Sequence, residues 1–547
     1  MAVDETSSFV PEIEPNDEAS PLIDDGSETA DRHVPDQAPK SSWELFILTL
    51  TMGGLQVVWS IQHSSGSPYL LSLGMSKALL AFVWVAGPLT GTLVQPYIGI
   101  RSDNCRSRWG KRRPFMVLGG TVTVICLLAL AWIREIVGTL LGIFGVDAQS
   151  DKVQSAAIVA AMILMYCLDF AINTIQAATR ALIVDNAPWY QQKTANAWAS
   201  RVSGAGNILG CIFGFMDLPK ILPILGNTQF QVLCVLTSLS LSVTLLITCI
   251  YTQEQVYHEE LQAGNALTPM SLVRLIHKSV NRLSSQTRRV FAIQFASWFG
   301  WFLFLFYATT YIGQLYVNPI FDEHHDLPDD EIDKKWVDAT RIGTFALFIN
   351  ATVSFAASII LPLLIPSGKE DEANDPGPSW RIHFFKVRVG TGLTLRRLWL
   401  LSQILFAACM LSTFFISTTG AASVMTGVIG IPWAITSWAP WAFIAEEIGQ
   451  EDTEQSPQSS SHDEESTEGG DTGIAGQAGI VLGLHNVFIS LPQIVSSLFS
   501  SAVFKLLQKP RGEPWDESVA WVMRFGGCVA LVAGYLTIAL REQQAKV

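Results

Sequence analysis

Two charged side chains, Asp169 and Arg180, belong to one long apolar stretch of the sequence, and charged groups in such stretches usually serve a function. They are eleven residues apart, close to three helical turns, so a helix places both on one face. Asn173 and Gln176 fall between them on that face, and Tyr166 extends it by one turn. Lipid cannot satisfy such a ladder of polar groups, so we expect it to face the protein interior or water.

The chemistry that this ladder favours is proton coupling. A carboxyl group removed from water prefers its neutral form, so Asp169 is a candidate to take up and release a proton. Arg180 reaches it only through motion, water or the hydroxyl groups of a solute. A protonated Asp169 would release Arg180 to bind a polar solute, and an ionised one would compete for it. The alternative is a fixed ion pair that only stabilises the helix bundle.

Amide side chains line further apolar stretches at spacings that place them on single helix faces, with Asn207, Asn486 and Gln493 as the main examples. Serine and threonine in such positions often only join helices, so the amides carry more weight. Convergent amides and hydroxyl groups with few charges suit a neutral polyhydroxyl solute better than an ion or a lipid.

Aromatic residues support that interpretation. The chain has 17 tryptophans, and several lie deep in apolar stretches, Trp59 among them. An indole ring packs on the C–H face of a sugar, although helix packing or interface anchoring is the simpler explanation for any single one. His63 and its neighbour Gln62 follow on the same stretch, and His63 is either a sugar donor, a titrating group or a packing histidine.

The composition is that of a membrane protein. Of 547 residues, 49% are hydrophobic and 15% are charged, whereas soluble domains carry about 25% charged residues. This excludes an ordinary soluble enzyme, a disordered chain and a nucleic-acid-binding protein. No CxxC pair, metal-ligand set or nucleophile–base set stands out, so we expect no enzyme, no metal and no cofactor beyond a coupling proton.

Twelve segments are long and apolar enough to cross a bilayer as helices, which predicts an all-α membrane protein. They lie near 44–72, 77–100, 115–133, 155–179, 196–216, 230–251, 290–313, 342–365, 398–416, 421–445, 475–503 and 518–540. The polar stretch 252–289 divides six segments from six, an arrangement typical of transporters built from two related halves.

The predicted domains follow from these segments. They are an acidic, disordered cytosolic tail at 1–41, an N-terminal six-helix bundle at 42–251, a cytosolic central loop at 252–289, a C-terminal six-helix bundle at 290–541 with an acidic cytosolic loop at 446–474, and a cytosolic C-terminus at 542–547. Loops placed inside by this scheme hold 19 Lys and Arg residues, and the other loops hold 10. Positive charge concentrates in cytoplasmic loops, so we expect both termini in the cytoplasm.

Several stretches resemble the sucrose/H+ symporters of the glycoside–pentoside–hexuronide type within the major facilitator superfamily. The sequence RSDNCRSRWGKRRPF at 101–115 resembles that family's loop between helices two and three, and LDFAINTIQAATR at 168–180 resembles its fourth helix, including the spacing of the acid and the arginine. The sequences GPLTGTLVQP at 87–96, GIPWAIT at 430–436 and GLHNVFISLPQ at 483–493 match as well.

The resemblance implies the major facilitator superfamily fold, with 12 transmembrane helices in two six-helix bundles, and proton-driven import of α-glucosides by alternating access. It implies that Asp169 accepts the proton and Arg180 binds sugar, and that the inner gate comprises Asp103, Gly110, Arg112 and Arg113. The further candidates for sugar binding are Asn173, Gln176, Gln62, His63, Trp59, Asn486 and Gln493.

Two departures from the family's plant members refine this expectation. The seventh-helix stretch FYATTYIGQ at 306–314 has no acid or arginine, so charge roles rest on Asp169 alone. The acidic tail and acidic loop suggest the fungal side of the family, where the disaccharide is sucrose or maltose. We therefore predict a monomeric plasma-membrane symporter. The alternatives are a vacuolar carrier of glucosides or monosaccharides and a sugar sensor that does not transport.

Overall fold

The computed structural model describes residues 39–103, 105–147, 150–188, 191–254, 283–324, 327–361, 394–455, 474–510 and 512–541. Within these ranges the chain is helical and contains no strand. The helices are α1 (Ser42–Ile61), α2 (Ser67–Ser72), α3 (Lys77–Val83), α4 (Ala86–Asp103), α5 (Arg113–Ala131), α6 (Ile133–Gly142), α7 (Asp151–Asn186), α8 (Gln192–Phe215), α9 (Leu218–Ile221), α10 (Gln229–Tyr251), α12 (Ser285–Glu323), α13 (Asp329–Ile360), α16 (Leu395–Leu411), α17 (Thr419–Gln455), α18 (Ile474–Leu507) and α19 (Ser518–Ile538).

Eleven helical spans in the described residues are long and apolar enough to cross a membrane, so the protein is a multi-span membrane protein. The predicted segment 196–216 folds as α8, which has 24 residues and runs beside α1, but Asn196, Arg201 and Asn207 make it too polar to count by composition. The exact number of twelve crossings therefore remains a prediction.

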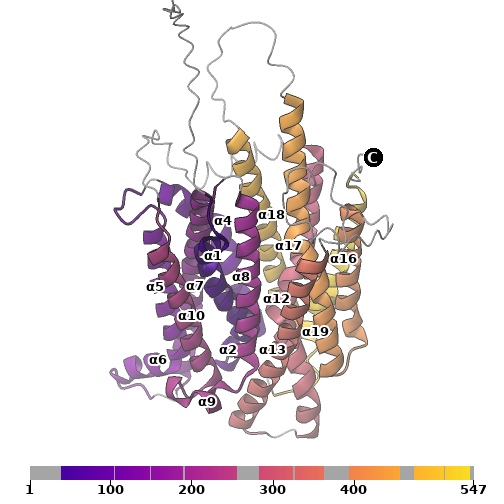
Figure 1. Cartoon of the computed structure of the whole chain (residues 1–547). Coiled ribbons are helices and arrows are strands. Elements are labelled where there is room, and N and C mark those ends of the chain that lie inside the picture. Colours follow the sequence, from indigo (N-terminus) through magenta and orange to yellow (C-terminus); the bar gives the residue numbers. More distant parts are fainter. Residues whose placement is uncertain are drawn as a thin grey trace, which may run out of the picture. The chain divides into compact units, whose positions relative to one another are not determined.

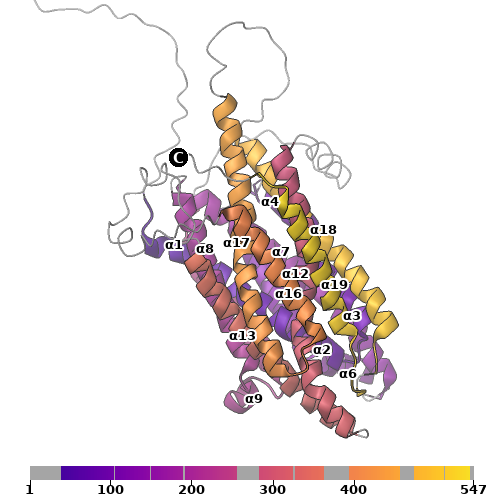
Figure 2. The same ribbon diagram turned by 90° about the vertical axis from the view of Figure 1, so that its right-hand side faces the viewer.

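The helices form two groups, α1 to α10 and α12 to α19, which lie side by side (Figures 1 and 2). Glycine allows close packing inside each group: a Cβ on Gly206 of α8 would overlap the carbonyl group of Gly53 on α1. In the second group, a Cβ on Gly300 of α12 would lie 2.9 Å from the carbonyl oxygen of Gly526 on α19. We call the two groups the first half and the second half.

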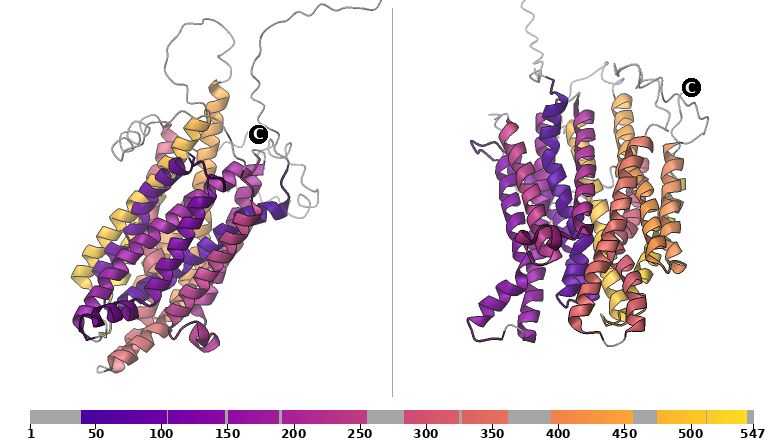
Figure 3. Two further views of the ribbon diagram at one scale, coloured as in Figure 1. Left: turned by 90° about the vertical axis from the view of Figure 1, so that its left-hand side faces the viewer. Right: turned by 60° about the horizontal axis from the view of Figure 1, so that its bottom comes forward.

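The two halves meet where α8 packs on α13, and where α18 packs on α3 and α4. The long helices run roughly parallel to one another, and successive ones run in opposite directions (Figure 3). The bundle has two ends, which we name by what lies there. We call the end where α1 begins the tail end, because Lys40 and Arg541 both lie there, bonded to Gln191 and Gln286. We call the opposite end, with α6 and α9, the far end (Figure 1).

The helices extend beyond the predicted apolar segments, because polar residues continue them past the hydrocarbon layer. The segment predicted at 155–179 is part of α7, which has 36 residues. The first predicted span contains a π-helical turn, Gln62–Gly66, between α1 and α2. The predicted tail 1–41, central loop 252–289, acidic loop 446–474 and C-terminus 542–547 lie mostly outside the described residues.

Candidate functional site

Asp169 lies in the middle of α7 with only 1% of its surface exposed. Its Oδ1 accepts a hydrogen bond of 2.7 Å from Nε2 of Gln62, in the π-helical turn. Its Oδ2 is buried and has no hydrogen-bond partner in the part of the chain that the structure describes. A π turn is often found at functional sites, and here the turn holds the amide that contacts Asp169. One oxygen is thus held by the protein while the other is available for a proton.

Asn173, one turn along α7, connects Asp169 to α4. Its Nδ2 donates to Oγ1 of Thr90 and to the carbonyl oxygen of Asp169, both at 2.9 Å. Its Oδ1 accepts from Nε2 of Gln95 at 2.7 Å. Because both amide atoms are already bonded and the residue is 3% exposed, its geometry favours positioning α4 against α7 over direct contact with a solute.

Trp59, His63 and Gln176, predicted separately, come together. Nε1 of Trp59 donates to Oε1 of Gln176 at 3.3 Å, and the Trp59 ring stacks on His63 with ring centres 5.6 Å apart. The His63 ring also meets the edge of Phe306, which belongs to α12 in the second half, at 4.8 Å. All three predicted residues are half-buried, and the contact of His63 with Phe306 places them at the boundary of the halves.

Arg180 lies on the face of α7 that carries Asp169, but it is exposed and makes no hydrogen bond or ion pair with any described residue. Eleven residues of helix separate the two by about 16 Å along the axis, so they cannot pair directly. Exposure rises along this face from Asp169, at 1%, and Asn173, at 3%, through half-buried Gln176 to Arg180. The face therefore opens toward the tail end.

The ladder ends before Tyr166, because the hydroxyl of this residue donates to the carbonyl oxygen of Phe82 instead of joining the Asp169 cluster. In the second half, Nδ2 of Asn486 donates to the carbonyl oxygen of Gly91 on α4 at 3.3 Å, which brings α18 against the cluster. Gln493 bonds the carbonyl oxygen of Ile489 in its own helix. No hydrogen bond within the described chain joins Gln493 to Asp169.

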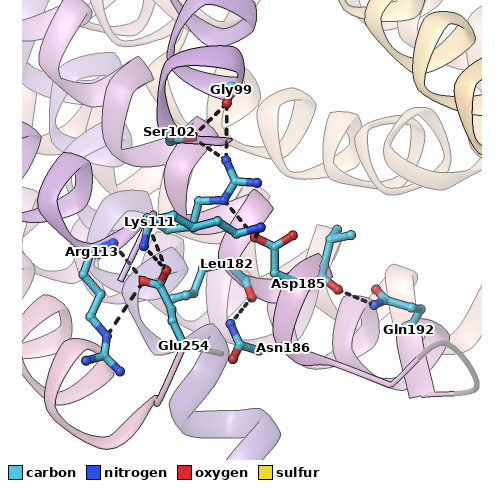
Figure 4. A network of polar contacts seen from close by, with 11 residues as sticks. Gly99, Ser102, Lys111, Arg113, Leu182, Asp185, Asn186, Gln192 and Glu254 are labelled. Carbon is cyan, nitrogen blue, oxygen red and sulfur yellow. Dashed lines mark hydrogen bonds and ion pairs between the residues drawn. The ribbon is translucent and has the colours of Figure 1, made fainter. Parts of the chain in front are cut away.

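The predicted gating loop is held at the tail end by two carboxylates, as Figure 4 shows. Nε of Arg112 lies 2.8 Å from Oδ2 of Asp185 on α7, and its Nη1 contacts Ser102 and the carbonyl oxygen of Gly99. Lys111 pairs with the same Asp185 oxygen at 3.1 Å. These contacts tie the end of α4 to the end of α7, so Arg112 positions the tail end of the helix that carries Asp169 and Arg180.

Glu254, just after α10, holds the backbone of the same loop. Its carboxylate accepts the N–H groups of Lys111, Arg112 and Arg113 at 2.6, 2.9 and 2.9 Å, and Nε of Arg113 lies 3.8 Å away. These N–H groups begin α5, so the negative charge also meets the positive end of the helix dipole. Gly110 has φ +107, a backbone conformation that favours glycine. A Cβ at this position would also meet the Glu254 carboxyl group. The side chain of Asp103 lies outside the described residues.

At the far end, a buried ion pair joins the two halves. Nζ of Lys77 on α3 lies 2.6 Å from Oδ2 of Asp516, just before α19, and their side chains are 8% and 4% exposed. The Lys77 backbone N–H donates to Oε1 of Gln508 at 2.9 Å. Burial of Asp516 acts to raise its pKa, but the Lys77 charge and the hydrogen bonds from Lys77 and Ser518 prevail and lower it. The lowered pKa of Asp516 favours its charged form, which pairs with Lys77.

Sequence reasoning missed several of these residues. Thr90 and Gln95 lie inside the matched stretch 87–96, and a glutamine in an apolar helix is a signal that could have identified Gln95. Asp185 and Glu254 lie in polar surroundings where acids are common, so their types alone carry no signal. The pairing of Lys77 with Asp516 joins residues 439 positions apart, which no local pattern reveals.

Apolar helices in two halves, with a polar face inside that opens at one end, are typical of membrane transport proteins. Solved transporters have similar folds. The nucleoside transporter NupG superposes with a TM-score of 0.54 at 12% identity, covering 91% of this chain and 99% of that one. A D-xylose–proton symporter superposes with a TM-score of 0.52 at 15% identity, covering 93% and 100%. At these identities the likeness shows the fold alone.

Sequence comparison identifies the family. The family model described as MFS/sugar transport protein matches residues 52–322. The general alpha-glucoside permease of Schizosaccharomyces pombe is 35% identical, covering 91% of this chain and 93% of that protein. Sucrose transport protein SUT1 of Oryza sativa subsp. japonica is 27% identical, covering 88% and 83%. The chain belongs to the MFS sugar transport family and is a transporter, not an enzyme, as the sequence predicted.

Proposed function

We propose that this protein imports α-glucoside disaccharides, sucrose or maltose, together with protons. The names of its relatives, an alpha-glucoside permease and a sucrose transport protein, support this substrate class. The observation that carries the coupling is Asp169, a buried carboxyl group with one oxygen bonded to Gln62 and the other without a partner among the described residues. A group in that setting can hold a proton in one state and lose it in another.

The tail end is the cytoplasmic end in this proposal. The loop 101–114 at that end holds six Lys and Arg residues, the densest positive charge of any loop in the sequence, and such loops stay in the cytoplasm. The ion pair of Lys77 closes the far end between the halves, while Arg180 is exposed toward the tail end. This combination supports an inward-open state, and we place the carrier in the plasma membrane as part of the proposal.

The transport cycle then follows from charge. From the outside, Asp169 takes up a proton at the free oxygen while Gln62 holds the other one. Sugar hydroxyl groups bind near Trp59, His63 and Gln176 and reach the guanidinium group of Arg180, which offers several N–H donors in one plane. When the site opens to the cytoplasm, Asp169 loses its proton and the sugar leaves. The polypeptide supplies every group in this scheme, and no further cofactor is invoked.

Uptake of radiolabelled sucrose and maltose, in a cell that lacks its own α-glucoside uptake, tests this function. We expect accumulation above the external concentration that collapses when a protonophore is added, and competition between the two sugars. Uptake that only equilibrates, with no effect of the protonophore, would contradict coupling. Sugar binding without uptake would identify a sensor, and a signal confined to vacuolar membranes would identify a vacuolar carrier.

Replacing Arg180 by lysine tests its role as a sugar ligand. Lysine keeps the charge but loses the planar set of donors, so we expect the half-saturation concentration for uptake to rise by roughly tenfold or more. Arg201→Lys is the matched control, because Arg201 is also exposed, its guanidinium group lies over the Trp198 ring, and it makes no hydrogen bond or ion pair with a described residue. Equal affinities in wild type and Arg180→Lys would reduce Arg180 to a packing role.

A further inference from the structure

A cavity of about 240 Å³ lies between the two halves at the far end, away from the Asp169 cluster. Residues from α3, α12, α13 and the segment before α19 form its wall. The polar residues of the lining include Thr309, Thr310, Gln314, Trp336, Lys77 and Asp516. The cavity therefore lies beside the ion pair that closes this end of the protein.

Three hydrogen-bonding groups in this wall are buried without partners. Thr309 and Thr310 are 1% and 2% exposed, and neither hydroxyl group has a hydrogen-bond partner in the described residues. Nε1 of Trp336 is buried and unpartnered in the same way. Buried polar groups in proteins are nearly always bonded, so these three groups in the wall of one cavity are available to bond a molecule that enters it.

The lining selects a neutral ligand rich in hydroxyl groups. Threonine hydroxyls both donate and accept, and the indole N–H of Trp336 donates, which matches a molecule that does both at several positions. Lys77 and Asp516 neutralise each other. The other charged lining residue is Lys509, which is exposed and whose ammonium group donates to the carbonyl oxygen of Pro514 outside the lining, so most of the cavity wall is uncharged. Its volume is below the range of about 300–1,000 Å³ that is usual for drug-sized ligands, which suits one sugar ring better than a whole disaccharide.

We propose that this cavity is a second carbohydrate site, which holds one glucosyl ring of the substrate at the far side before the sugar moves to the Asp169 cluster. The proposal rests on the import function proposed above. It also gives a role to the stretch 306–314 of α12, which has no acid or arginine but supplies Thr309, Thr310 and Gln314 to the cavity. Hydroxyl and amide groups perform the recognition there, in place of charges.

Thiol labelling of Thr310→Cys in intact cells tests the site. A charged, biotinylated methanethiosulfonate that cannot cross the membrane is added outside, with and without sucrose or maltose. We expect labelling above the wild-type background set by the native cysteines, and we expect either sugar to slow it several-fold. Protection should persist when Thr310→Cys is combined with Gln176→Ala, because the sugar occupies the cavity itself.

Any other outcome contradicts the proposed second carbohydrate site. Labelling that sugar does not slow means that the cavity holds no sugar. Protection that disappears with Gln176→Ala means that sugar acts only from the central cluster, and absence of labelling means that the cavity is not reached from outside. Wild-type uptake is read separately: if the wild-type chain imports no α-glucoside, the import function fails, whereas normal uptake without protection removes only the second site.

Affinity provides a second readout with nearly isosteric variants. Thr310→Val and Trp336→Phe each remove one hydrogen-bonding group, and both should raise the half-saturation concentration for disaccharide uptake several-fold. Thr352→Val is the control, because the Thr352 hydroxyl group is exposed and bonded to Phe348 in its own helix. Unchanged affinity in both cavity variants would contradict the proposal.

Discussion

At the far end, the buried ion pair between Lys77 and Asp516 joins the two halves, whereas at the tail end the ion pairs that Arg112 makes with Asp185 and Arg113 makes with Glu254 lie within the first half. A hydrogen bond also joins the halves at the far end, where Ser501 of α18 donates to the carbonyl oxygen of Ala78 on α3. A contact between halves must break for the protein to open, but a contact within one half can move with it. We therefore expect the far-end pair to stabilise the closed far end, and the tail-end network to maintain the shape of the first half.

Lys77→Met should produce the largest effect. It leaves Asp516 buried without its partner, and breaking one side of a buried pair typically costs about 3–5 kcal/mol. We expect the closed far end to lose most of its population. In a variant without native cysteines, spin labels at Lys152→Cys and Lys334→Cys, two exposed far-end positions in different halves, should report a longer distance.

The double variant Lys77→Met with Asp516→Leu is the control for that experiment. Replacing both members of a buried pair by apolar residues is often neutral, so the far end should close again. If Lys77→Met alone left the distance between the labels unchanged, the ion pair would not be what holds the far end closed.

Glu254→Gln should have a smaller effect of another kind. The amide loses the charge that faces three backbone N–H groups, which costs about 1–3 kcal/mol. We expect a lower melting temperature of the purified protein with the same far-end distance. Glu323→Gln, at an exposed position, should change neither quantity. A change in the far-end distance in Glu254→Gln would remove the distinction between the two ends.

Acidity should have the smallest effect on the far end. Because the pKa of Asp516 is lowered, its contribution to closure is fully present above the ordinary value of about 3.9 and is lost only as pH falls below that value and through the lowered pKa. The distance between the far-end labels should therefore be the same at pH 6 and pH 5. Opening between those values would show that a different group controls closure.

The sequence predicted the helical class, most of the spans and the shared face of Asp169, Asn173, Gln176 and Arg180, because hydropathy and helical period are local properties. It could not predict the π-helical turn that holds Gln62 against Asp169, since a turn of that kind depends on the packing around it. It also could not show that Arg180 is open to the tail end, because exposure depends on how the halves meet. The roles of the predicted site residues remain predictions.

The most direct test of the mechanism is Asp169→Asn. Asparagine has nearly the same shape and can still accept the hydrogen bond of Gln62, but it cannot bind and release a proton. The account predicts that this variant equilibrates labelled sucrose or maltose without accumulating either, and that sugar no longer makes the external medium more alkaline. Accumulation at the wild-type level, still abolished by a protonophore, would contradict the claim that Asp169 couples the proton to the sugar.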